Sequence, residues 1–211
     1  MTAKEIPVAR RNAALVAREL FEERGEEIRL TDVAATGRIS RRKLDELFES
    51  DDDLFEATVE LWFEPHVAIM EEVVSSDLPS NRKMYEFFAR RFAVNRERYR
   101  ADPIAFARMC EAGAARFERV RGFVDLADHY LSELIAQAQH DGYFAGLEID
   151  QCLSLINQMV SSYTMPDGLI YIEERLNEDK LARIIDTIFI GLSAETGDEA
   201  KGLNTIRVAA T

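Results

Sequence analysis

Cysteine, proline and glycine are all scarce in this 211-residue chain, which has 2 cysteines, 5 prolines and 10 glycines. Cys110 and Cys152 are too few for a disulfide framework or a four-cysteine zinc site, and they suit a reducing compartment. So few glycines and prolines leave little material for the turns of a β-rich protein, so we expect a helical chain. No apolar run reaches the length of a signal-peptide core or a membrane span, which predicts a cytoplasmic protein.

Positive charge is also in short supply, because 26 lysines and arginines face 39 acidic residues and the net charge is −13. As an average, this acidity argues against nucleic-acid binding, which depends on cations that displace counterions from phosphates. Residues 1–50, however, carry ten cations and ten anions, and the whole acidic excess lies in residues 51–211. A neutral module attached to an acidic body indicates two different functions.

Apolar spacing predicts three helices in the first fifty residues, over 7–24, 32–36 and 41–48. Ser40 stands where it can cap the third helix, and Gly37 lies in the three-residue turn that precedes it. Two short helices joined by such a turn form a helix-turn-helix.

Past residue 50 the pattern stays helical. Ser50 and three aspartates start a fourth helix, in which Pro65 should produce a kink. Further helices should begin near Ser80, Asp102, Ala114, Asp150 and Glu178. We therefore expect an all-α fold of about nine helices: a helix-turn-helix module at 1–50, a helical bundle at 51–194, and an unstructured tail at 195–211.

Short motifs follow one another at fixed spacing between residues 10 and 56. They are Leu20-Phe21-Glu22-Glu23-Arg24-Gly25, Leu30-Thr31-Asp32-Val33-Ala34, Ile39-Ser40-Arg41-Arg42-Lys43-Leu44, and Phe48-Glu49-Ser50 with Leu54. This series resembles the tetracycline-repressor (TetR) family of transcriptional regulators. The resemblance implies an N-terminal module that binds operator DNA and a larger helical domain that binds a small ligand. It also implies a homodimer formed through the last two long helices.

The expected recognition helix has a basic first turn, the part of such a helix that enters the major groove. Arginine can read guanine through two hydrogen bonds, and a serine at a helix start can hold a phosphate. The candidate DNA contacts are Arg10, Arg11, Thr31, Arg38, Ser40, Arg41, Arg42, Lys43 and Asp45.

Three acidic residues depart from the family pattern. Asp45, followed by Glu46, stands where the family usually has tyrosine, and Asp51 stands where it usually has lysine. Two interpretations remain open. Asp45 or Glu46 accepts a hydrogen bond from cytosine in an unusual operator, or the module binds DNA weakly or not at all.

The middle of the body is rich in aromatic side chains, which predicts a pocket for an apolar or aromatic effector; plain core packing is the alternative for each residue. The candidate pocket residues are Trp62, His66, Phe88, Arg91, Phe92, Phe106, Met109, Phe117, Phe123, Tyr130, Gln158 and Tyr163.

Two late helices carry apolar stripes that could pair with the same helices of a second subunit in a four-helix interface. The candidates are Leu153, Ile156, Val160, Leu181, Ile184, Ile185, Ile188 and Leu192. The alternative is that both stripes face the chain's own core.

Catalysis is not expected, because His66, His129 and His140 show no metal-ligand spacing and no glycine-rich phosphate loop is present. The sequence predicts a transcriptional repressor that binds operator DNA as a homodimer and is released from the DNA by an effector. We expect no cofactor, no metal and no membrane partner. The alternative is a degenerate relative that binds a small molecule or a protein but little or no DNA.

Overall fold

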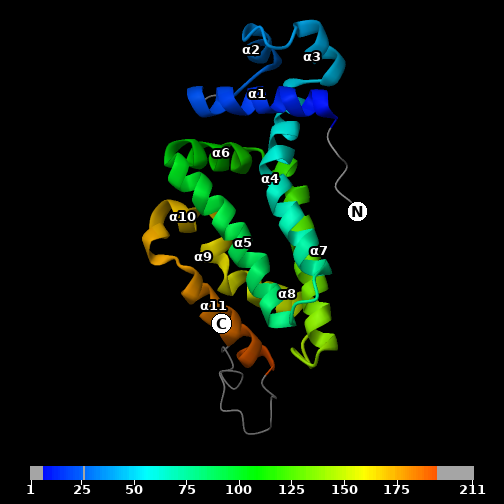
Figure 1. The fold of residues 1–211 in the computed structure, drawn as a ribbon, viewed down its shortest axis with the longest axis vertical. Helices are drawn as coiled ribbons and strands as arrows, with labels where there is room; N and C mark the ends of the chain where they lie inside the picture. Colours follow the sequence, from blue (N-terminus) through cyan, green and yellow to red (C-terminus); the bar gives the residue numbers. More distant parts are fainter. Residues whose placement is uncertain (1–6, 26, 194–211) are drawn as a thin grey trace, which may run out of the picture.

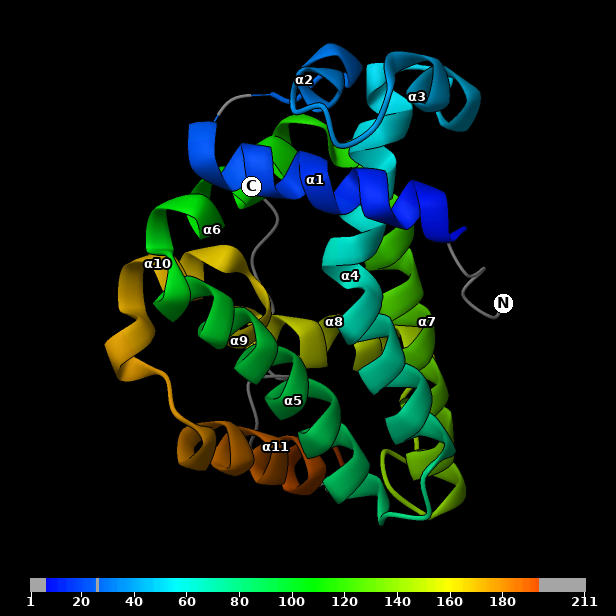
Figure 2. The same cartoon turned by 45° about the horizontal axis from the view of Figure 1, so that its top comes forward.

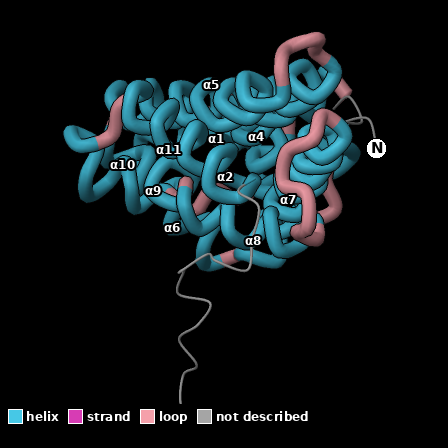
Figure 3. The backbone as a smooth tube through the Cα atoms, turned by 90° about the horizontal axis from the view of Figure 1, so that it is seen from below, coloured by secondary structure: helices cyan, strands magenta, loops and turns pink. Residues whose placement is uncertain are grey.

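The computed structural model describes residues 7–25 and 27–193. This part of the chain is all-α, as predicted, and contains no strand (Figure 3). The helices are α1 (Val8–Arg24), α2 (Leu30–Ala35), α3 (Arg41–Leu47), α4 (Asp51–Ser75), α5 (Ser80–Ala101), α6 (Pro103–Ala115), α7 (Phe117–His140), α8 (Ile149–Met159), α9 (Ser161–Thr164), α10 (Pro166–Ile172), the 3₁₀ turn η1 (Glu173–Arg175) and α11 (Glu178–Ser193). None of these helices is long and apolar enough to cross a membrane. The expectation for residues 195–211 lies outside the described residues.

Helix starts differ from the expected ones where another residue takes the cap position. Arg29 rather than Thr31 precedes α2, and its backbone N–H donates to the Asp32 carboxylate at 2.9 Å. Pro79 precedes α5 and Glu148 precedes α8, each one or two residues ahead of the expected cap. The short helices α9 and α10 lie outside the expected set, because four and seven residues are too few to show a helical period.

The fourth helix begins as predicted and runs unbroken through Pro65 to Ser75. The Ser50 hydroxyl accepts from the backbone N–H of Asp53 at 3.2 Å, and three aspartates occupy the first turn at the positive end of the helix dipole.

Two separate apolar clusters divide the molecule. The first holds α1, α2 and α3 together at one end of the molecule (Figure 1). It includes Leu54, Ala57 and Leu61, so the packing of the module continues past residue 50 into the first three turns of α4. The boundary between the module and the body therefore falls inside α4.

The second cluster forms the core of the body. Its largest fully buried side chains include Phe87, Phe92, Leu131 and Ile135, from α5 and α7. The fifth helix contacts α4, α7 and α11, and so connects the helices of this bundle (Figure 2). Among the described helices, only α4 belongs to both clusters, and it carries the chain from the module into the body.

Candidate functional site

The expected recognition helix is α3. The Ser40 hydroxyl caps it by accepting from the backbone N–H of Lys43 at 3.3 Å. Leu44 is fully buried against the module, and this fixes which face of the helix points inward. Arg41, Arg42 and Lys43 are exposed, as a DNA-reading surface requires.

Each of these three cations pairs with an acidic residue of the same helix. Arg41 lies 2.8 Å from the Asp45 carboxylate, while Arg42 and Lys43 lie 3.4 Å and 3.1 Å from Glu46. Exposed pairs of this kind contribute only about 0–1 kcal/mol, so a phosphate could replace the carboxylates at small cost. The pairs nevertheless cancel much of the positive field of α3.

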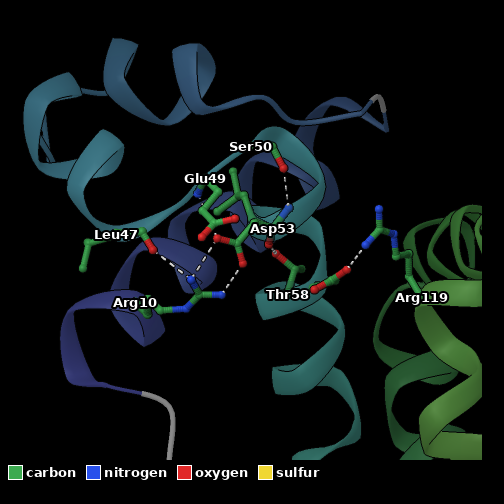
Figure 4. Close-up of polar contacts among 9 residues, drawn as sticks. Arg10, Leu47, Glu49, Ser50, Asp53, Thr58 and Arg119 are labelled. Atoms are coloured by element: carbon green, nitrogen blue, oxygen red, sulfur yellow. Dashed lines mark hydrogen bonds and ion pairs between the residues drawn. The ribbon is translucent and has the colours of Figure 1, made fainter.

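Arg10 has a different role from the predicted phosphate contact. Its guanidinium donates to both Asp53 carboxylate oxygens, at 2.6 Å and 3.0 Å, and to the Leu47 carbonyl at 2.8 Å (Figure 4). It also lies over the Phe48 ring, 4.6 Å from its centroid. This pairing lowers the pKa of Asp53 and raises that of Arg10. Arg10 therefore fastens α1 to the end of α3 and the start of α4, and its donors point into the module.

The remaining candidate contacts lie at the surface. Arg11 pairs with Glu64 at 2.5 Å, and Arg38 pairs with Glu19 at 2.5 Å. Thr31 is exposed on α2. No described feature of these three residues conflicts with a contact to DNA.

Asp51, the residue that departs from the family's lysine, has a structural explanation. Its carboxylate accepts from the backbone N–H of Leu30 at 2.8 Å and so satisfies the first turn of α2. The neighbouring Asp52 pairs with Arg119 of α7 at 3.1 Å, and Arg119 also pairs with Glu56. These acids hold the module together and attach it to the body.

A cavity of about 470 Å³ opens between α4, α5, α6 and α7, within the size range of small-molecule sites. Its lining recurs every three or four residues along each helix, as one face of a helix does. Ten of the twelve candidate pocket residues line it, namely Trp62, His66, Phe88, Arg91, Phe92, Phe106, Met109, Phe117, Phe123 and Tyr163.

Two candidate pocket residues lie elsewhere. The Tyr130 hydroxyl donates to Glu71 at 3.2 Å, and Gln158 is exposed and bonded to Ser154 at 3.4 Å. Both are one position away from the stripe that faces the cavity.

Other lining residues are not among the candidates from the sequence, although several lie one helical turn from a candidate. They include Phe55, Val59, Phe63, Phe87, Asn95, Asp128 and Asn157. Periodicity alone could have found those on α4 and α5. The hydrogen bond from the Asn157 amide to Asp128 at 2.9 Å joins α8 to α7 and has no local sequence signal.

The polar end of the cavity contains a neutral histidine. His66 is 3% exposed, and its Nε2 lies 3.0 Å from the Asn95 amide oxygen. Burial, together with the nearby charges of Arg91 and Arg98, lowers the pKa of His66 to about 3. Arg98 donates to the Trp62 carbonyl at 2.9 Å and lies over the Trp62 ring at 4.2 Å.

A second cavity, of about 370 Å³, lies where α1 and α4 meet α6. Phe55 and Met109 line both cavities. On α4, Leu54 and Ala57 pack in the module, whereas Phe55 and Val59 face the larger cavity. The same turns of one helix therefore contact the module and the cavity.

The predicted dimer stripes face largely inward. Ile156, Val160, Leu181, Ile185 and Ile188 are at most 1% exposed and belong to the body's own core. For these five the interface prediction is wrong, because a residue covered by its own chain presents no surface to a partner. Leu153, Ile184 and Leu192 are only partly buried against the same core.

The described residues contain no group of three histidines, cysteines or acids placed to hold a metal ion. His129 lies on the surface, 3.3 Å from Glu133. Cys110 lines the cavity, and burial raises the pKa of its thiol to about 12, so the thiolate is disfavoured.

Comparisons with known proteins agree on one fold. The chain is similar to the fatty acid degradation regulator FadR from Bacillus halodurans (TM-score 0.64, 10% identity, covering 91% of this chain and 100% of that one). It is also similar to a TetR/AcrR-family transcriptional regulator from Thermobifida fusca (TM-score 0.56, 16% identity, 86% and 97%). A third similar structure is the TetR-family regulator PfmR from Thermus thermophilus (TM-score 0.52, 17% identity, 87% and 97%).

A search of curated proteins gives no match. A family model described as the tetracyclin repressor-like C-terminal domain matches residues 80–185, which is half of the chain. The chain therefore belongs to the tetracycline-repressor (TetR) family of transcriptional regulators.

Proposed function

We propose that the protein is a ligand-responsive repressor that binds operator DNA as a homodimer through α3 and is released by an apolar or aromatic effector. One observation carries the proposal: α4 contributes Leu54 and Ala57 to the core of the module and Phe55 and Val59 to the wall of the cavity. A ligand that moves the cavity wall must also move the helix on which the module is built.

The DNA contacts that we propose are the half-buried Arg11, whose side chain is 40% exposed, and the exposed residues Thr31, Arg38, Ser40, Arg41, Arg42, Lys43 and Asp45. Two modules read half-sites about one DNA turn apart, so a small rotation of α4 is enough to spoil the fit. The effector then acts by binding better to the conformation that no longer matches the groove.

For the homodimer we propose the outer face of α8 and α11, two helices that contact each other. Leu155 and Met159 of α8 and Ile190 of α11 are apolar and 37%, 45% and 75% exposed. Four such helices would cover these apolar side chains. Light scattering should give twice the 24.0 kDa chain mass, and Ile190→Glu should halve it.

A second function is favoured by the ion pairs of α3. Since Asp45 and Glu46 pair with all three cations of the helix, the module can also be a degenerate one that binds little DNA. The body would then bind its ligand, or a protein partner, without regulating transcription.

In vitro selection of DNA fragments separates the two. The repressor proposal predicts an enriched sequence with two half-sites, and a gel shift with that fragment at low salt. The Arg41→Ala/Arg42→Ala variant should lose this shift. Arg82→Ala/Arg90→Ala, which removes two exposed cations of α5, should retain it. No enrichment and no shift at any salt would favour the degenerate module.

A further inference from the structure

Arg91, on α5, is a cation that pairs with no described residue. It lines the cavity, its Nε is shielded from solvent, and the Nε–H donates no hydrogen bond within the described part of the chain. Its guanidinium lies over the Phe87 ring, 4.8 Å from the centroid. No carboxylate of a described residue forms an ion pair with it.

One acid in the cavity wall acts on Arg91 without forming an ion pair with it. Asp128 lines the same cavity and its charge acts on Arg91, but its carboxylate accepts from the Asn157 amide at 2.9 Å. Burial lowers the pKa of Arg91 to about 10, which still leaves it charged at pH 7. A partly shielded charge that has no counterion destabilises the folded chain. The cavity therefore holds a fixed positive charge that an anion would stabilise.

A second polar atom in the cavity wall also lacks a partner. The Nδ1 atom of His66 is shielded from solvent and makes no hydrogen bond to any residue that the structure describes. The rest of the wall is apolar and largely aromatic, with Trp62, Phe88, Phe92 and Phe106 from three helices. An apolar wall with one cation at its polar end fits a ligand that is apolar along its body and anionic at one end.

The charge on that end is limited to one. A single guanidinium can bind both oxygens of one carboxylate, and the negative charge of Asp128 in the same cavity disfavours any further anionic group. We propose that the cavity binds an amphipathic monocarboxylate, with an acyl or aryl body against the aromatic wall and the carboxylate on Arg91. This inference rests on the proposed function of the cavity as the effector site.

Calorimetric titration of the full chain with two acids, dodecanoate and 4-phenylbutyrate, tests the proposal and distinguishes the acyl from the aryl source. Methyl esters of both acids serve as uncharged probes with the same bodies. At least one acid should bind, and at least tenfold more tightly than its ester. Arg91→Met should weaken the acid at least tenfold and leave the ester unchanged or tighter, while Arg91→Lys should retain part of the preference.

Arg90→Met is the matched control, because Arg90 precedes Arg91 on α5 but pairs with Glu72 at the surface at 2.7 Å. It should bind the acid as the unmodified chain does. Equal binding of acid and ester, unchanged acid binding by Arg91→Met, or no binding of either acid would overturn the proposal. If DNA is selected but no acid binds, only this inference fails. If an acid binds but no DNA is selected, only the repressor proposal fails.

Discussion

The cations of the module and the arginines beside the cavity of the body are compensated in different ways. Of the described cations in residues 7–50, all except Arg29 pair with a described carboxylate, as Arg10 does with Asp53 at 2.6 Å. In the body, Arg91 and Arg98 lie beside the cavity against aromatic rings and uncharged acceptors. Charge is already compensated in the module, whereas in the cavity it is left without a counterion.

Whether a carboxylate of the chain pairs with an arginine cannot be read from the sequence alone, but it decides what the arginine does. An internally paired arginine such as Arg10 stabilises the fold, and its guanidinium is not available to bind a ligand. An arginine that the fold leaves unpaired destabilises the empty protein and is available to an anion. The opposite signs of these two effects can be measured.

Replacing each arginine by methionine should give the largest contrast. Arg10→Met removes a charge-assisted pair and leaves Asp53 partly buried, so it should destabilise the chain by about 2 kcal/mol. Arg91→Met removes an unpaired charge and should stabilise the ligand-free chain by about 1 kcal/mol. Urea unfolding followed by circular dichroism measures both. Arg11→Met, in an exposed pair, should change stability by less than about 0.5 kcal/mol. Destabilisation by both Arg10→Met and Arg91→Met would remove the contrast.

Acid should weaken the body before the module. His66 keeps a pKa of about 3 in the folded chain against about 6.5 when unfolded, so protons favour the unfolded state as pH falls below about 6.5. The expected loss between pH 7 and pH 5 is about 2 kcal/mol. Asp53 affects the free energy of unfolding at a lower pH than His66 does. Because its pKa is lowered in the folded chain, its stabilising contribution is present above about pH 4 and is lost as pH falls through the folded-state pKa.

Urea midpoints at pH 7 and pH 5 check this order. His66→Gln should remove most of the loss over that interval, and His129→Gln, on the exposed surface of α7, should leave it in place. An unchanged pH dependence in His66→Gln would contradict the assignment of the buried neutral imidazole.

The ion pairs of α3 should have the smallest effect. Asp45→Asn/Glu46→Gln removes two negative charges beside the reading surface and should raise affinity for a selected fragment about tenfold. Asp77→Asn/Asp125→Asn, two exposed acids of the body, should raise it far less. Anisotropy titrations at fixed salt measure the change. A fall in affinity for Asp45→Asn would instead assign Asp45 to base reading, the other interpretation of this acidic residue.

Features that depend on neighbours in the chain could be predicted from the sequence. The Ser40 and Ser50 caps and the turn at Gly37 are local, and they place α3 and α4 correctly. The pair between Arg10 and Asp53 joins residues 43 positions apart, so no spacing rule connects them.

The same distinction explains the results for the cavity and the interface. An amphipathic stripe shows that one face of a helix is covered but not by which chain, so Ile156 and Ile185 could be taken for interface residues although they are core. The many aromatic residues in the middle of the body predicted a pocket, and Arg91, one of the polar candidates for it, lies in the cavity wall. The absence of a partner for Arg91 among the described residues depends on where Asn157 holds Asp128, which only the three-dimensional structure reveals.

The most direct test of the account is whether filling the cavity releases DNA, because α4 is proposed to link the two. A labelled selected fragment bound to the protein would be titrated with dodecanoate or 4-phenylbutyrate, whichever calorimetry shows to bind. The account predicts that anisotropy falls to the value of unbound DNA, and that the Arg91→Met complex needs at least tenfold more acid. DNA that stays fully bound when calorimetry shows the cavity saturated would contradict it.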